Sequence, residues 1–337
     1  MNQTLRDRTP RRAFSGIQPT GEAHLGNYLG AIRNWVEGQD DHEGIFCIVD
    51  LHSMTLAWDP RELRAQTVAK GAELMACGID PERSTLFVQS HVPEHTELAW
   101  VLTCIARMGE LRRMVQFKEK SRGETESVGV GLFTYPVLQA ADVLLYRAHG
   151  VPVGEDQRQH VELMRDLATR FNSSFGETFV VPEAWIPGTG ARIMALDDPT
   201  QKMSKSEGDV RPNSVIGVTE PPAAIAKKIK SAVTDSGKEA VAAPDKPALT
   251  NLLTMFSTVE GTPVADLEVR FEGAGYGDFK AALADAVVAA LAPIRERYEQ
   301  LMSDPGETER ILARGAVKAA AVARDTMVDV RARAGLA

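Results

Sequence analysis

The chain is poor in cysteine, has no long apolar run, and is not expected to carry a secretory leader. Its three cysteines, Cys47, Cys77 and Cys104, lie far apart without Cys-x-x-Cys spacing. This argues against a zinc or iron–sulfur site and favours a reducing compartment, the cytoplasm. The first twelve residues are polar and rich in arginine, unlike a secretory signal. No apolar stretch approaches the length that spans a bilayer. We therefore expect a cytoplasmic protein with no membrane span and no metal held by the protein.

The chain also lacks an excess of positive charge, because 38 Lys and Arg face 46 Asp and Glu, a net charge of −8. No global basic field indicates a nucleic-acid partner, although binding RNA needs only a local patch of Lys and Arg. With 44% hydrophobic and 25% charged residues, the composition is that of a globular protein. At 337 residues the chain is long enough for two structural units.

The first half alternates predicted strands and helices. Strands are predicted at 13–17, 45–50, 85–89 and 151–153, and helices at 25–38, 60–77, 94–114 and 131–149. The run Ile45–Asp50 is almost continuously apolar, which is typical of a parallel strand buried on both faces. The alternation predicts the α/β class with an open parallel sheet, whose ligands bind at the carboxyl ends of the strands.

The second half has a different character. Prolines punctuate helices predicted at 223–233, 246–258, 279–302 and 307–335, and no strong strand signal follows Ser206. This pattern predicts a helical bundle appended to the α/β part. Lys227, Lys228 and Lys230 lie on one of these helices, either to meet RNA phosphates or simply as a solvated face.

One polar, glycine-containing segment, Ser15–Asn27, follows the first predicted strand. His24, Gly26 and Asn27 fall at a helix amino terminus, where unpaired backbone N–H groups attract phosphate. Gly26 lets a flat base approach the backbone, and the His24 and Asn27 side chains can donate hydrogen bonds to phosphate or ribose. The segment equally fits a plain strand–turn–helix. It is not a P-loop, because Glu22-Ala23 follow Gly21 where that motif has Lys and a hydroxyl residue.

A second candidate loop is Lys202-Met203-Ser204-Lys205-Ser206, which follows an apolar stretch and the turn at 197–200. Its two lysines, separated by two residues, can place both ammonium groups on one polyphosphate. Taken alone, the loop fits a solvated basic turn better.

Several polar residues stand where a ligand could bind. Asp142 interrupts the apolar stretch 139–145, where a carboxylate needs a partner, either internal or a ligand N–H. Gly154, Glu155 and Asp156 follow a strand end, where a carboxylate can bind ribose hydroxyls or cap a helix. His52 also falls at a strand end, as a ligand contact or as a turn residue.

Together and in this order, the two loops resemble the paired signature loops of class I aminoacyl-tRNA synthetases. The whole chain resembles bacterial tryptophanyl-tRNA synthetases, in the stretches Phe14–Gly21, Cys47–Asp50, Gln116–Ser121, Val151–Gln157 and Ser231–Ser236. The resemblance implies a Rossmann-like catalytic domain at 1–210 with a helical connective insertion at about 91–145. It also implies a helical anticodon and tRNA-binding domain at 211–337, whose last helix packs back on the catalytic domain, and a homodimer.

The resemblance also assigns site residues. It implies ATP contacts at Gln18, Pro19, Thr20, His24, Gly26, Asn27, Gly154, Glu155, Asp156, Ile193, Lys202, Met203, Ser204, Lys205 and Ser206. It implies tryptophan contacts at Phe14, Val49, His52, Gln139, Asp142, Val151, Val153 and Gln157, with Asp142 accepting the indole N–H. Catalytic roles are implied for Gln18, Lys120, Lys202 and Lys205.

The implied reaction has two steps: tryptophan attacks the α-phosphorus of ATP, and the terminal adenosine of tRNA(Trp) then takes the acyl group. Mg²⁺ accompanies ATP, held mainly by phosphate oxygens. Asn27 stands where the wider class has His, as in the tryptophanyl branch, and Gln139 stands where many members carry Met, which leaves selectivity toward tryptophan analogues open. The alternatives are a tyrosyl-tRNA synthetase or other adenylate-forming ligase, and a silent paralogue that binds tryptophan or RNA. The context of Asp142 and the two intact loops argue against them.

Overall fold

The centre of the protein is one parallel sheet. The structure, a computed structural model, describes residues 11–114, 129–186, 192–204 and 210–336. Within these residues five strands pair in the order β3-β2-β1-β4-β5, every pair parallel. They are β1 (Arg12–Ile17), β2 (Glu43–Ile48), β3 (Thr85–Val88), β4 (Gly150–Pro152) and β5 (Glu183–Trp185). The predicted α/β class is confirmed. The sequence did not indicate β5, which is three residues long and directly follows Pro182.

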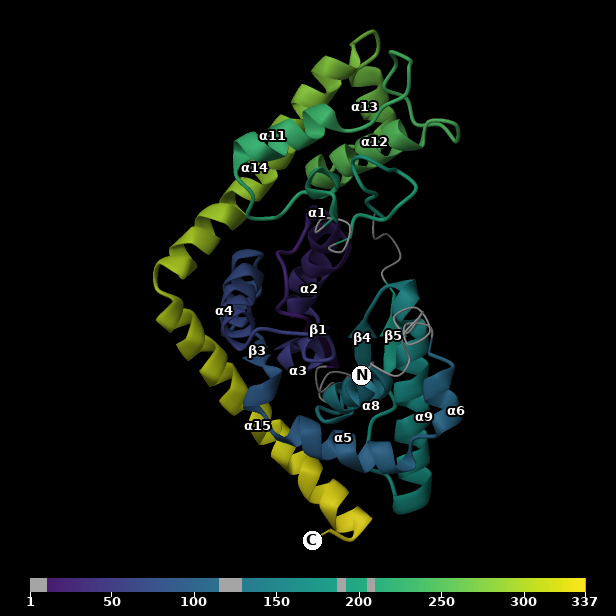
Figure 1. The fold of residues 1–337 in the computed structure, drawn as a ribbon, viewed down its shortest axis with the longest axis vertical. Helices are drawn as coiled ribbons and strands as arrows, with labels where there is room; N and C mark the ends of the chain where they lie inside the picture. Colours follow the sequence, from purple (N-terminus) through teal and green to yellow (C-terminus); the bar gives the residue numbers. More distant parts are fainter. Residues whose placement is uncertain (1–10, 115–128, 187–191, 205–209, 337) are drawn as a thin grey trace, which may run out of the picture.

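The helices of the first half cover both faces of this sheet (Figure 1). They are α1 (Leu25–Asn27), α2 (Arg33–Glu37), α3 (Asp50–Ser53), α4 (Pro60–Ala76), α5 (Glu94–Ile105), α6 (Met108–Arg112), α8 (Val130–Leu144) and α9 (Arg158–Phe175). A π-helical turn, Tyr28–Ile32, joins α1 to α2, so the helix predicted at 25–38 is one continuous helical run. Short 3₁₀ turns lie at Gly38–Asp40, Gln89–His91 and Glu155–Gln157.

Helix α4 has clear start and stop signals. The Asp59 carboxylate accepts hydrogen bonds from the N–H groups of Arg61 and Glu62, at 2.8 and 3.1 Å, and Pro60 occupies the first turn. Gly78, with φ of 112°, ends the helix in a conformation that other residues rarely adopt. The helix predicted at 94–114 is instead two helices, because Ala106 is extended, with φ of −68° and ψ of 146°.

Two hydrophobic cores lie on the two faces of the sheet, and β2 contributes to both. Phe46 and Ile48 belong to one core, while Ile45 and Cys47 belong to the other. Successive strand residues point to opposite faces, so a nearly continuous apolar run is what a strand covered on both sides requires. The first core continues through α4 into the helices of the second half.

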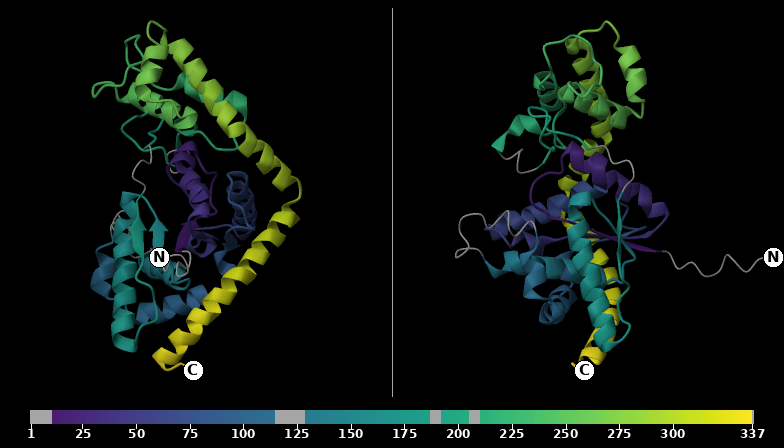
Figure 2. Two further views of the ribbon diagram at one scale, coloured as in Figure 1. Left: turned by 180° about the vertical axis from the view of Figure 1, so that it is seen from behind. Right: turned by 90° about the vertical axis from the view of Figure 1, so that its right-hand side faces the viewer.

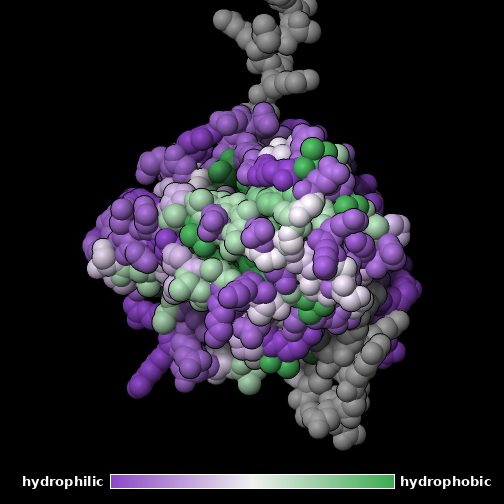
Figure 3. Space-filling model, turned by 90° about the horizontal axis from the view of Figure 1, so that it is seen from above, coloured by the Kyte–Doolittle hydropathy of each residue, from purple (hydrophilic) through white to green (hydrophobic). Residues whose placement is uncertain are grey.

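The second half is helical, as predicted. A 3₁₀ turn, Pro212–Ser214, precedes α11 (Pro222–Ser231), α12 (Pro247–Glu260), α13 (Val264–Arg270), α14 (Tyr276–Ser303) and α15 (Pro305–Ala334). The short helix α13 was not predicted. Figure 2 shows α11 to α13 gathered at one end, with α14 and α15 running away from them along the molecule. Seen from this end, the surface is mainly hydrophilic with smaller apolar areas (Figure 3).

Helix α15 lies against the edge of the sheet, in contact with β3, α4 and α5. Its approach is close because Gly315 has no side chain: a Cβ there would lie 1.8 Å from the carbonyl oxygen of Leu86. Among the described residues, no helix is both long enough and apolar enough to cross a membrane.

Candidate active site

A pocket of about 270 Å³ opens at the carboxyl ends of β1, β2 and β4. Its lining includes all eight residues that the sequence predicts around tryptophan, namely Phe14, Val49, His52, Gln139, Asp142, Val151, Val153 and Gln157. Gln18 lines it as well. Gly16 leaves space at its wall, since a Cβ there would lie only 3.1 Å from Val49 Cγ1. Residues far apart in the sequence therefore surround one cavity, because parallel strands end at the same edge of the sheet.

Asp142 is the buried anion of this pocket, with 1% of its surface exposed. One carboxylate oxygen faces His52 Nε2 at 2.8 Å. The other accepts from Gln89 Nε2 at 2.6 Å and faces His95 Nδ1 at 2.7 Å. A carboxylate only accepts, so both facing ring nitrogens carry a proton.

These contacts fix the charge of Asp142. Burial by itself raises the pKa of the carboxyl group, but the hydrogen bonds from His52 and His95 outweigh it and hold the pKa well below its usual range. The group is therefore an anion with three donors. A carboxylate has about four acceptor positions, so one remains for a ligand N–H. The sequence left open whether the partner of Asp142 is internal or a ligand N–H, and the structure shows three internal partners.

The structure adds pocket residues that the sequence analysis missed. Tyr135, Val143 and Met164 also line the cavity. Burial raises the pKa of Tyr135 to about 12, so its hydroxyl stays protonated. Tyr135, Gln139 and Asp142 are spaced i, i+4 and i+7 on α8, which places them on one helix face. That spacing was the sequence signal that could have identified Tyr135.

The predicted phosphate segment begins a helix, as expected. The N–H of Asn27 donates to His24 Nδ1 at 3.1 Å, and the N–H of His24 donates to Asn27 Oδ1 at 3.3 Å. His24 Nδ1 must be unprotonated to accept. Burial, followed by the nearby charges of Lys202 and Lys70, lowers the pKa of His24 to about 4 and keeps the ring neutral. With Nδ1 as the acceptor, the neutral ring carries its proton on Nε2.

The second signature loop meets the first. Met203 donates its N–H to the carbonyl of Ile193 at 3.0 Å, and Lys202 pairs with Met194 across a short antiparallel bridge. Gly26 lies between the two loops: a Cβ there would be in ordinary contact with Met203 Cβ at 3.5 Å and would crowd His24 Nδ1 at 3.1 Å. Asn251 of α12 holds the hairpin by accepting from the N–H of Met194 at 2.8 Å and donating to its carbonyl at 3.1 Å.

The remaining predicted ATP residues fall into two groups. Pro19 and Thr20 follow β1, whereas Gly154 and Glu155 are exposed after β4, where Glu155 pairs with Arg158 at 2.6 Å. Ser204 is the last described residue of its loop. The predictions for Lys120, Lys205 and Ser206, and for the Asp156 side chain, lie outside the described residues.

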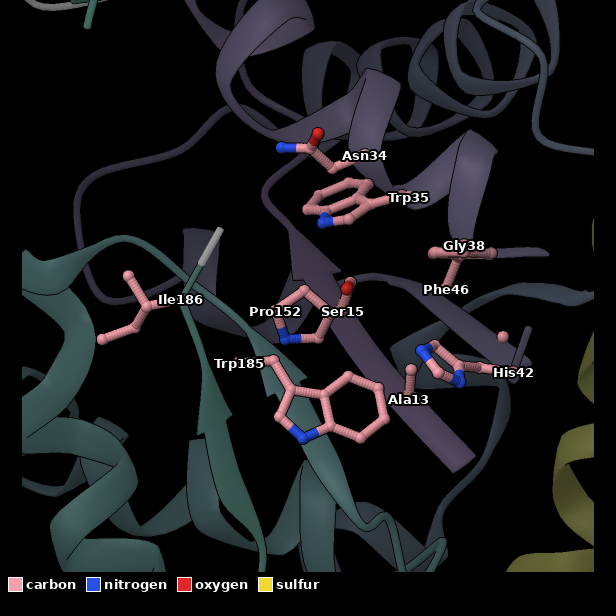
Figure 4. Close-up of a pocket in the computed structure, with 11 residues that line it drawn as sticks. Ala13, Ser15, Asn34, Trp35, Gly38, His42, Phe46, Pro152, Trp185 and Ile186 are labelled. Atoms are coloured by element: carbon pink, nitrogen blue, oxygen red, sulfur yellow. The ribbon is translucent and has the colours of Figure 1, made fainter. Parts of the chain in front are cut away.

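A second cleft of about 240 Å³ lies beside α2, lined by Trp35, His42, Phe46 and Trp185 among others (Figure 4). It shares Ser15, Trp35 and Pro152 with the Asp142 pocket. None of the residues predicted to bind ATP or tryptophan lines it, and Asp142 is absent from its walls. The candidate active site is therefore the Asp142 pocket with the two loops beside it.

Comparisons with known proteins agree with this geometry. The family model described as tRNA synthetases class I (W and Y) matches residues 6–292. The tryptophan–tRNA ligase of Wolinella succinogenes is 51% identical over 326 residues, which cover 97% of this chain and 99% of that protein.

Solved structures are similar over the same extent. The tryptophanyl-tRNA synthetase of Mycoplasma pneumoniae superposes with a TM-score of 0.86 at 36% identity, covering 97% of this chain and 98% of that one. The tryptophanyl-tRNA synthetase of Campylobacter jejuni, complexed with ADP and tryptophan, gives a TM-score of 0.85 at 36% identity, covering 96% of this chain and 100% of that one. The chain belongs to the class I tRNA synthetases of the tryptophan and tyrosine family.

Proposed function

We infer that this chain is a tryptophan–tRNA ligase, which activates L-tryptophan with ATP and transfers it to tRNA(Trp). The observation that carries the inference is Asp142, a buried anion with one acceptor position left, at the wall of a pocket that Ser15, Gly16 and Gln18 also line. Met203 of the second signature loop lies against Gly26 of the same segment. The extent of the match to the ligase of Wolinella succinogenes supports the same conclusion.

The tryptophan side chain fits the chemistry of this pocket. An indole is a large apolar frame with one N–H that donates and cannot accept. Phe14, Val49, Val151 and Val153 supply apolar surface, and the carboxylate of Asp142 supplies the acceptor. Gln139 lies on the Asp142 face of α8, one turn before it, and contributes to selectivity among indole analogues.

Activation is a displacement at phosphorus. A tryptophan carboxylate oxygen forms a bond to the α-phosphorus of ATP, and the bond to the pyrophosphate oxygen breaks. The protein positions the reactants and stabilises charge on the phosphates. The amino terminus of α1, with His24, Gly26 and Asn27, faces the nucleotide, and Lys202, Lys205 and Lys120 approach the phosphates. Mg²⁺ would accompany ATP, bound mainly to phosphate oxygens, and would supply positive charge at the phosphates.

The second half receives the tRNA. In this proposal residues 1–210 are the catalytic domain and 211–337 bind the anticodon side of the tRNA. Lys227 and Lys230 are exposed on α11 and can reach phosphates. Lys228 has a structural role instead, because it pairs with Glu220 at 2.6 Å and donates to the Val215 carbonyl at 2.9 Å.

A homodimer accounts for an exposed apolar patch beside the active site. Trp100 of α5 is 70% exposed and Met54 is 41% exposed, and both line one shallow cavity together with Tyr135 of the tryptophan pocket. Patches of this kind mark protein interfaces, and a second copy would cover this one by two-fold symmetry.

The free cysteines Cys47, Cys77 and Cys104 suit the cytoplasm, where we place the enzyme.

The test is pyrophosphate exchange into ATP, measured with each of the twenty amino acids in turn. Tryptophan should support exchange far better than any other amino acid, and tRNA(Trp) should then be charged. Exchange with tyrosine would identify the tyrosine branch of the family, and no exchange with any amino acid would mean a silent paralogue.

A further inference from the structure

Helix α4 carries a buried ion pair that the proposed mechanism does not use. Lys70 and Glu73 are each 3% exposed, and Lys70 Nζ contacts Glu73 Oε2. The spacing i, i+3 puts them on one helix face. The apolar pattern of α4 gave no sign of this, since charged residues on an amphipathic helix are expected to face water.

The second oxygen of Glu73 reaches the signature segment. Glu73 Oε1 accepts a hydrogen bond from the backbone N–H of Ala23 at 2.7 Å, and Ala23 directly precedes His24. The Ala23 carbonyl in turn accepts from the N–H of Val218 at 2.9 Å. Both polar atoms of this backbone unit are therefore engaged, one by α4 and the other by the chain that leads into the helical half.

Helix α4 is itself fixed against the long C-terminal helices. It contacts α14 and α15, and a Cβ on Gly71 would lie 2.8 Å from Leu312 of α15. The Glu73 carboxylate therefore extends from a rigid support. Lys70 holds one oxygen, which orients the other toward Ala23.

An ion pair is a costly way to fill this space. Two charges lose their hydration here, and hydrophobic residues of similar size stabilise a fold as well or better. Burial raises the pKa of Glu73 even though Lys70 and the Ala23 N–H favour its anion. A pair kept at that cost indicates a role in placing a neighbouring group.

We propose that Glu73, oriented by Lys70, is a positioning residue that fixes Ala23 and with it His24 and the amino terminus of α1 for ATP. The proposal rests on the proposed function in one respect: the nucleotide bound at α1 is the ATP of amino-acid activation. It assigns Glu73 no contact with substrate.

Two double variants separate positioning from folding. Lys70→Met with Glu73→Gln removes both charges and keeps an oxygen for Ala23, whereas Lys70→Met with Glu73→Leu removes the acceptor as well. In pyrophosphate exchange, the Leu variant should lose about 10-fold in kcat/KM for ATP relative to the Gln variant, because His24 and the amino terminus of α1 would no longer be held in place for the nucleotide. Tryptophan affinity, measured by equilibrium dialysis, should agree within twofold between the two.

Equal kcat/KM values for ATP in the two variants would overturn the proposal. It would also be overturned if the Leu variant lost affinity for tryptophan by the same factor as kcat/KM for ATP. The exposed pair Glu307 and Arg310 on α15 has the same i, i+3 spacing. Glu307→Leu with Arg310→Met is the matched control and should change neither constant.

A measurement on the parent protein covers the case in which the Leu variant does not fold. Amide hydrogen exchange at Ala23 should be strongly protected without nucleotide and change little when ATP is added. Rapid exchange in the nucleotide-free protein would contradict the proposal. If the parent protein catalyses no pyrophosphate exchange with any amino acid, the proposed function fails. Protection of the Ala23 amide from hydrogen exchange would even then show whether Glu73 holds that N–H.

Discussion

The two sides of the proposed active site are both hydrogen-bonded, but they are assembled from different parts of the chain. On the amino-acid side, His52, Gln89 and His95 surround Asp142, and all four residues belong to the first half. On the nucleotide side, the segment at 22–27 is held by Glu73 of α4 and by residues 216–219, which lead into the helical half. Asn251 of α12 holds the neighbouring hairpin.

This difference has a consequence for the two substrates. The proposed tryptophan pocket contains its own polar partners, so we expect it to keep its shape without a nucleotide. The nucleotide side depends on how the helical half sits against the catalytic half. Changes in the helical half should therefore affect ATP and tRNA first, and tryptophan last.

The largest expected effect is on the nucleotide side. Lys205→Ala should lower kcat for pyrophosphate exchange by about 10²–10³-fold, since the proposed role of this lysine is to stabilise charge that develops on the phosphates. Tryptophan affinity should be unchanged. Steady-state exchange kinetics check this, and an unaltered kcat would remove Lys205 from the chemistry.

The matching change on the amino-acid side is Asp142→Ala. It should raise the KM for tryptophan about 10²-fold and narrow its advantage over phenylalanine, with little change in the KM for ATP. The 10⁴–10⁵-fold rejection known for sites with an unpaired polar group is not expected here, because His52, Gln89 and His95 already satisfy Asp142.

Asp142→Asn sharpens that prediction. The amide keeps an acceptor oxygen for the indole, but its NH₂ group faces side chains that donate to the carboxylate in the parent. Its KM for tryptophan should therefore lie between those of the parent and the Ala variant. Exchange kinetics with tryptophan and phenylalanine measure all three proteins. Undiminished discrimination in the Ala variant would make Asp142 a purely structural carboxylate.

His24, on the nucleotide side, should make the stability of the folded protein depend on pH. The folded protein holds His24 neutral down to about pH 4, whereas the unfolded chain binds a proton below about 6.5. Acidification therefore favours unfolding in this window, by up to about 3 kcal/mol from His24 alone. His24→Asn retains an N-cap without titrating. Urea unfolding from pH 7 to 4 should show a shallower fall for this variant, and parallel curves would contradict the assignment.

The smallest effect is expected on α11. Lys227→Ala with Lys230→Ala should leave pyrophosphate exchange intact and lower the salt dependence of tRNA binding by about one unit of slope per lost phosphate contact. A binding series at several salt concentrations measures the slope. An unchanged slope would return both lysines to the solvated face of the helix.

Much of the fold follows from the sequence because periodicity reports burial. The alternation of apolar runs gave the strands β1 to β4, and Asp59 and Gly78 marked the ends of α4. The strand β5 was not predicted, because its three residues after Pro182 are too few to show an alternation of apolar and polar side chains. The predicted tryptophan residues came from resemblance, and the structure brings them to one pocket.

The partners of these residues were harder to predict, because they are set by tertiary contacts. A carboxylate in an apolar stretch predicts that Asp142 has partners, but His95 and Gln89 are separated from it by about 50 residues in the sequence. Lys70 and Glu73 look like surface charges until α14 and α15 cover α4. Local pattern does not encode that covering.

The most direct test of the contrast between the two sides is a calorimetric titration of tryptophan into the protein without ATP. The parent and Lys205→Ala should bind tryptophan with the same affinity, and Asp142→Ala should bind it about 10²-fold more weakly. If tryptophan binds the parent only after ATP is added, the pocket is not complete on its own, and the contrast between the two sides is wrong.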